Sequence, residues 1–71
     1  MRRISVDSSN LVSVGYDAER RILEIEFHSG SVYQYSGVPE SVYRDLMSAD
    51  SHGLYFDREI KKAGYPYDRI D

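Results

Sequence analysis

One stretch, from Phe27 to Pro39, restricts the fold of this chain more than any other segment. It contains a turn signal at 28–30, a run with two tyrosines two positions apart, and a proline typical of a helix start. Because side chains alternate across a strand, Tyr33 and Tyr35 must share one face of a sheet. The length of the turn decides which face they take.

Two turn lengths fit these residues. A three-residue loop, with Gly30 in the left-handed third position, puts both tyrosines on the face that carries Ile25. It aligns the strands in the pairs Phe27–Ser31, Ile25–Tyr33 and Leu23–Tyr35. A two-residue loop would instead set the tyrosines beside Glu24 and Glu26. We favour the three-residue loop, because it gathers the aromatic and aliphatic side chains on one surface.

The residues before this hairpin predict one more strand, from Leu11 to Tyr16, and a polar turn over 17–21. A two-residue or a four-residue loop gives the same pairing of Tyr16 with Leu23, Val14 with Ile25 and Val12 with Phe27. The expected apolar face consists of Val12, Val14, Tyr16, Leu23, Ile25, Phe27, Tyr33 and Tyr35. The expected hydrated face carries Ser13, Asp17, Glu24, Glu26 and Gln34.

Helices are the expected cover for the apolar face. Pro39 suits the first helical position, and apolar residues then recur at helical spacing over 39–49. The residues 50–53 break the pattern and supply caps, and a shorter helix is expected over 54–62, with Phe56 and Ile60 inward. The remaining tail is expected to run extended to Asp71.

The predicted fold is therefore a single α+β domain over residues 1–71, a three-stranded antiparallel meander covered on one face by two helices. We expect residues 1–10 to form a flexible, solvated arm. The alternative is a short edge pairing by Ile4 and Val6, which alternate with polar neighbours.

Composition limits the class of protein. With 71 residues, 41% hydrophobic and 30% charged, the chain has ordinary globular values and room for one domain. It contains no cysteine, so disulfides and thiolate metal sites are excluded. No apolar run approaches the roughly 20 residues of a membrane span, and we expect a cytoplasmic location without membrane contact. The net charge of −3 opposes unspecific binding to phosphate backbones.

The C-terminal stretch is the best candidate for nucleic-acid contact, because cations alternate there with aromatic rings. The residues concerned are Arg58, Lys61, Lys62, Tyr65, Tyr67 and Arg69. A solvated helix end explains the same residues and is the favoured interpretation. Likewise, a base-stacking platform is the functional interpretation of Tyr33 and Tyr35, but the favoured register makes them a structural core pair.

No arrangement of residues predicts catalysis. Asp50, Ser51 and His52 have the residue types of a triad, but adjacent positions in a turn rarely converge on one reacting atom. Capping explains Asp50 and Ser51 more simply. His28 and His52 lack metal-ligand spacing, so no metal or cofactor is expected.

The chain resembles the KTSC domain, a short module named for the C-terminus of some lysyl-tRNA synthetases and also found as a stand-alone small bacterial protein. The resemblance is carried by Ser8-Ser9, Gly15-Tyr16-Asp17, Leu23 to Phe27, Ser29-Gly30, Tyr33-Gln34-Tyr35, Val38-Pro39, Ala49-x-Ser51-x-Gly53, Tyr55-Phe56, Ile60 and the closing tyrosines. It implies no catalytic residue, and it suggests RNA binding only through the synthetase association.

These observations favour a non-catalytic small binding module whose partner the sequence does not identify. One alternative is an RNA- or tRNA-binding domain that uses the C-terminal basic and aromatic residues. The other is a protein–protein adaptor or homodimerisation module, since an outer strand leaves backbone groups free for pairing.

Overall fold

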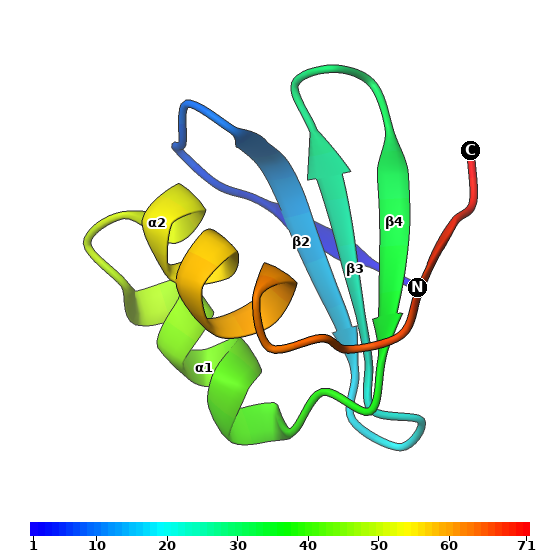
Figure 1. Cartoon of the computed structure of the whole chain (residues 1–71). Coiled ribbons are helices and arrows are strands. Elements are labelled where there is room, and N and C mark those ends of the chain that lie inside the picture. Colours follow the sequence, from blue (N-terminus) through cyan, green and yellow to red (C-terminus); the bar gives the residue numbers. More distant parts are fainter.

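The computed structural model describes residues 1–71 as one antiparallel sheet covered on one face by two helical segments (Figure 1). The strands are β1 (Arg3–Ser5), β2 (Leu11–Asp17), β3 (Ile22–Phe27), β4 (Val32–Ser36) and β5 (Tyr67–Arg69), in the order β1-β2-β3-β4-β5. The helices are α1 (Glu40–Ser48) and α2 (His52–Phe56), and α2 continues into the π-helical turn η1 (Asp57–Lys61).

The sheet has five strands, so the prediction of three was wrong. The predicted meander corresponds to β2, β3 and β4, and each edge gains a three-residue strand. The N-terminal segment, expected to be a flexible arm, pairs with β2 through Ile4 and Val14. The tail, expected only to be extended, pairs with β4 through Asp68 and Gln34. In Figure 1 this tail (red) runs beside β4.

The hairpin of β3 and β4 has the predicted register. Ile25 lies opposite Tyr33 and Leu23 opposite Tyr35, and the N–H of Phe27 donates to the carbonyl of Ser31 at 2.9 Å. Gly30 has a φ of 95°, a conformation that side chains with a Cβ rarely adopt. Both tyrosines therefore lie on the face that the helices cover.

Pairing between β2 and β3 follows the prediction at one end only. Tyr16 lies opposite Leu23 and Val14 opposite Ile25, through the four-residue loop. An irregularity between Leu11 and Ser13 then puts Leu11, not Val12, opposite Phe27. This bulge brings Leu11 to zero exposure, so Leu11 replaces Val12 in the core.

The helices cover the core, as expected from the spacing of their apolar residues. Leu46 of α1 has no exposed surface, and Phe56 and Ile60 are 6% and 0% exposed. Pro39 is the residue before the helix, not its first residue, because its ψ of 152° is extended. The second helix begins at His52, two residues before the predicted start, because the hydroxyl of Ser51 caps it by accepting from the N–H of Leu54.

The face opposite the helices is less hydrated than predicted. Arg3 crosses this face, forms an ion pair with Glu24, and donates through Nε to the Ser13 hydroxyl at 2.9 Å. Gly15 lies between Arg3 and Glu24, and a Cβ there would stand 2.8 Å from the Arg2 carbonyl and 3.0 Å from the Arg3 side chain. The missing side chain lets Arg3 reach across β2, which leaves Glu24 only 5% exposed.

Candidate functional site

An aromatic groove opens between the sheet and the second helical segment. Its volume is about 450 Å³. The lining residues are Phe27, Tyr33, Tyr35, Phe56, Lys61 and Tyr67. Five of the six are aromatic, so the surface offered to a ligand consists of ring faces and edges beside one ammonium group. We call these residues the aromatic groove.

Strand pairing explains why the rings converge. Tyr35 lies opposite Tyr67 of β5, and Tyr33 is two positions away on the same face of β4. The ring centroid of Tyr67 lies 5.8 Å from that of Tyr33 and 5.6 Å from that of Tyr35. From the helical side, the Phe56 ring meets Phe27 at 5.3 Å and Tyr35 at 5.4 Å, edge to face. The rings of the sheet and of the helix that line the groove, apart from Tyr67, therefore also pack against the core.

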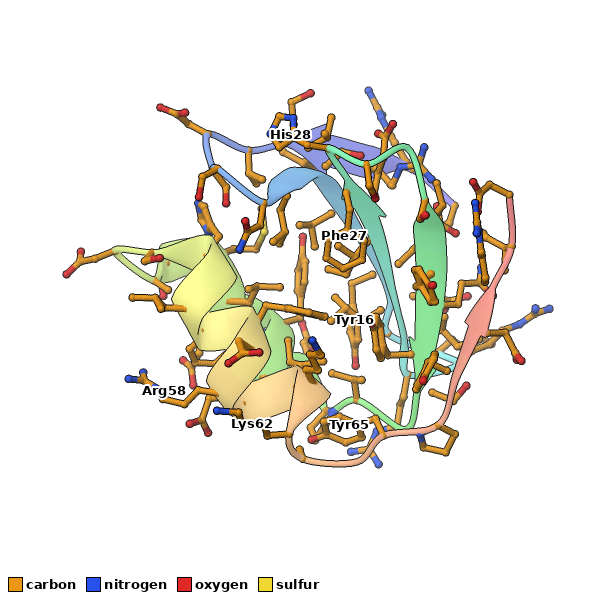
Figure 2. The ribbon with its side chains drawn as sticks, turned by 45° about the horizontal axis from the view of Figure 1, so that its top comes forward. Tyr16, Phe27, His28, Arg58, Lys62 and Tyr65 are labelled. Atoms are coloured by element: carbon orange, nitrogen blue, oxygen red, sulfur yellow. The ribbon has the colours of Figure 1, made fainter.

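A more polar hollow of about 330 Å³ adjoins the aromatic groove. Its lining residues are Ser9, Asn10, Phe27, His28, Ser29, Gly53, Phe56, Asp57 and Lys61. Phe27, Phe56 and Lys61 line both spaces, so they mark the boundary. In Figure 2, Phe27 points into the interval between the sheet and the helix, with His28 above it. We call this second space the polar hollow.

Lys61 differs from its basic neighbours in having no carboxylate within 4.0 Å. Arg58 is 3.7 Å from Glu59, and Lys62 is 3.4 Å from Asp57. Lys61 also belongs to the π-helical turn η1, a rare geometry that occurs frequently at functional sites. The boundary of the two spaces therefore carries one cation whose charge is not balanced by a neighbour.

The structure brings together two of the six residues predicted for nucleic-acid contact, Lys61 and Tyr67, in the aromatic groove. Arg58 and Lys62 extend from the helical segment away from the sheet (Figure 2). Tyr65 packs against the core. Arg69 lies opposite Tyr33, and its Nε donates to Asp71 at 2.9 Å. The proposed nucleic-acid contact remains a prediction for this set.

Tyr33 and Tyr35 take the core positions that the favoured register predicted, and they also line the aromatic groove. Tyr35 is 7% exposed and belongs to the core, while Tyr33 is half-buried against it. Sequence reasoning did not assign Phe27 and Phe56 to a site, since their apolar character and spacing indicate only core positions.

The histidine and serine of the 50–53 turn have structural roles. Ser51 Oγ accepts from the N–H of Leu54 at 3.2 Å, and His52 Nδ1 lies 2.8 Å from the carbonyl oxygen of Leu46. This histidine contact joins the end of α1 to the start of α2. No group of three or more His, Cys, Asp or Glu side chains is close enough together to hold a metal ion. None of the helices has the length and apolar character needed to cross a bilayer.

Burial raises the pKa of Tyr35 to about 12, and the neighbouring Tyr33 and Tyr67 add to the effect. The ordinary pKa is about 10, so the folded protein holds this proton more tightly than the unfolded chain does. The resulting stability is fully present below pH 10 and is lost as the pH rises through 12. We expect the free energy of unfolding to fall over this window.

Urea denaturation at several pH values, together with phenolate absorbance, measures this dependence. We expect Tyr35→Phe to flatten the decline, because it removes the proton. Tyr67→Phe should flatten it only slightly, because Tyr67 is 62% exposed and is the smallest cause of the raised pKa of Tyr35. Equal slopes in the Tyr35→Phe variant and the natural chain would contradict the assignment.

Comparisons with known proteins find a matching family and several similar chains. The KTSC domain profile matches residues 7–65. An uncharacterized protein of Stutzerimonas stutzeri is 48% identical over all 71 residues and over its own full length. A lysine–tRNA ligase of Nostoc punctiforme is 44% identical over 55 residues, which cover 78% of this chain and 10% of the ligase.

The fold is also similar to a solved structure. The crystal structure of a KTSC domain protein from Yersinia pestis superposes with a TM-score of 0.93 and 43% sequence identity, over 99% of this chain and 97% of that one. The match therefore includes the two edge strands as well as the central meander. On this agreement of sequence and structure, the chain belongs to the KTSC domain family.

Proposed function

We propose that this protein is a non-catalytic binding module and that the aromatic groove is its ligand site. One observation carries the proposal: five aromatic side chains surround a space of about 450 Å³ with an unpaired lysine at its edge. Small-molecule and side-chain pockets are mostly apolar, measure about 300–1,000 Å³ and contain few polar groups. The groove fits this description.

The proposal also accounts for the local residues. Tyr67 keeps 62% of its surface exposed although it contacts two other rings, so a large apolar surface is available for contact. Aromatic side chains dominate the energetics of many binding sites because they bury a large area at a low entropy cost. Lys61 orients a bound ligand and selects for a negative charge. These are properties of a recognition site and include no nucleophile activated by a neighbouring base.

An NMR titration of the labelled full-length chain tests the proposal. Short RNA, a tRNA pool and short peptides with aromatic residues are added separately, and the amide shifts are assigned. We expect a ligand to perturb residues of the aromatic groove, and we expect Tyr67→Ala to remove the effect without unfolding the protein. A ligand whose shifts fall outside the groove and persist in the Tyr67→Ala variant would overturn the proposal. Chemical conversion of the ligand would contradict its non-catalytic part.

RNA or tRNA binding is the second candidate. It is supported by the similarity to a lysine–tRNA ligase of Nostoc punctiforme, an enzyme that by its name acts on tRNA. Tyrosine faces beside Lys61 would suit base stacking with a phosphate contact. The net charge of −3 opposes it. Binding of this kind should weaken steeply with salt and after the charge reversals Lys61→Glu and Lys62→Glu. Binding that is insensitive to salt would contradict it.

A further inference from the structure

The aromatic groove and the polar hollow form two compartments of one site. They share Phe27, Phe56 and Lys61, so a ligand that fills one compartment borders the other. The first compartment presents five rings, and the second presents the hydroxyl and amide groups of Ser9, Asn10 and Ser29. A ligand complementary to both has an apolar part next to a part rich in hydrogen-bonding groups.

The charge of Lys61, at the boundary of the two compartments, limits the chemical class of ligand that they can bind. Lys61 has no carboxylate partner, whereas the acidic residue of the polar hollow, Asp57, is neutralised by Lys62 at 3.4 Å. One ammonium group matches one anionic group. A polyphosphate chain requires several cations, and the overall charge of −3 repels it. A ligand with a single carboxylate is the better electrostatic match.

We propose that the two compartments bind the C-terminal residue of a partner protein. A large apolar side chain enters the aromatic groove, the terminal carboxylate meets Lys61, and the preceding backbone lies in the polar hollow. Asn10, Ser9 and Ser29 can donate hydrogen bonds to the peptide carbonyls there. Capture of a terminal carboxylate is an established mode of peptide recognition. This inference rests on the proposed function of the aromatic groove.

Residues 67–71 do not occupy the two compartments. The Asp71 side chain accepts from the N–H of Val32 at 3.1 Å and from Arg69 Nε at 2.9 Å, which anchors the tail along β4. In Figure 1 the marked C-terminus accordingly lies beside β4, on the side of the sheet away from α2. The tail along β4 therefore leaves the two compartments open to a partner.

The test uses the full-length chain and the peptide acetyl-Gly-Gly-Phe with a free carboxylate. The same peptide with an amidated end removes the charge, and acetyl-Gly-Gly-Ala removes the ring. Lys61→Met keeps the aliphatic stem and removes the charge. Arg58→Met is the matched control, because Arg58 is paired with Glu59 at 3.7 Å and lines neither compartment. Affinities come from NMR titration, with a short RNA run in parallel.

We expect the free-acid peptide to shift Phe27, Tyr33 and Lys61. Amidation and Lys61→Met should each weaken binding about twofold to fivefold, because Lys61 is exposed and water screens its ion pairs. Arg58→Met should leave the affinity unchanged. The alanine peptide should bind more weakly than the phenylalanine peptide.

Three outcomes would overturn the inference. Equal binding of the amidated peptide, or of the Lys61→Met variant, would exclude carboxylate recognition while leaving the groove as the site. If RNA but not the peptides shifts residues of the groove, the ligand class is RNA instead of a peptide, and the groove remains the binding site. If ligands shift only residues outside the groove, both the inference and the proposed function fail.

Discussion

Replacing Leu46 by alanine is expected to lower the free energy of unfolding by about 2–5 kcal/mol. Leu46 is the one residue of α1 that is fully buried, so this side chain anchors the helix to the sheet. The substitution removes its apolar contacts and leaves a cavity that the surrounding core fills only in part. A chain of 71 residues at about 0.05–0.15 kcal/mol per residue has about 4–11 kcal/mol in all. The loss is thus a large share of the stability.

Urea denaturation followed by circular dichroism measures this effect. Leu54→Ala is the matched control, because Leu54 lies in the neighbouring helix α2 and is 68% exposed. We expect the control to change the free energy of unfolding by about 0.5 kcal/mol or less. Similar losses in the two variants would mean that α1 is not held through Leu46.

Replacing Arg3 by methionine is expected to destabilise the protein by about 2–3 kcal/mol. The Glu24 side chain is 6% exposed and would lose its ion-pair partner, although Gln34 Nε2 still donates to it at 2.9 Å. Removing one partner of a buried pair costs more than the pair contributes, because a desolvated charge is left behind. This value lies at and just below the lower end of the usual range of about 3–5 kcal/mol, because the Arg3 side chain is 31% exposed and water screens the interaction.

Two further variants make this prediction specific. Arg44→Met breaks an ion pair at 3.0 Å whose side chains are 73% and 51% exposed, and it should cost about 0.5 kcal/mol or less. The double variant Arg3→Met/Glu24→Gln removes the stranded charge and should regain part of the stability. If the Arg3 and Arg44 variants lose equal stability, burial of Glu24 does not control the effect.

The central hairpin could be predicted from local sequence because its register depends on nearby residues. Gly30 takes the left-handed conformation that closes a three-residue loop, and this parity puts Tyr33 and Tyr35 on the apolar face. The helices followed from the 3.6-residue spacing of apolar side chains and from the Ser51 cap. These features need no knowledge of distant parts of the chain.

The candidate site could be predicted only in part. Lys61 and Tyr67 belong to the basic and aromatic stretch that the sequence indicates. Of their neighbours in that stretch, Arg58 and Lys62 point away from the sheet, and Tyr65 packs against the core. Phe27, Tyr33 and Phe56 join the first two residues because β3, β4 and α2 meet there. A groove is a property of surfaces that face each other, so a linear pattern around one member does not reveal the rest.

The sequence by itself determined the central meander, the face of its tyrosines and the two helices that cover them, since hydrophobic periodicity and turn chemistry act over a few residues. Only the tertiary structure decided the edge strands, the bulge that exchanges Val12 for Leu11, and the burial of Glu24. The edge strands have three residues each, so the alternation at Ile4 and Val6 indicated the first only as an alternative, and the tail gave no periodic signal. Both form because β2 and β4 offer unpaired backbone groups. With β5 in place Tyr67 closes the aromatic groove, so the candidate site depends on a long-range pairing.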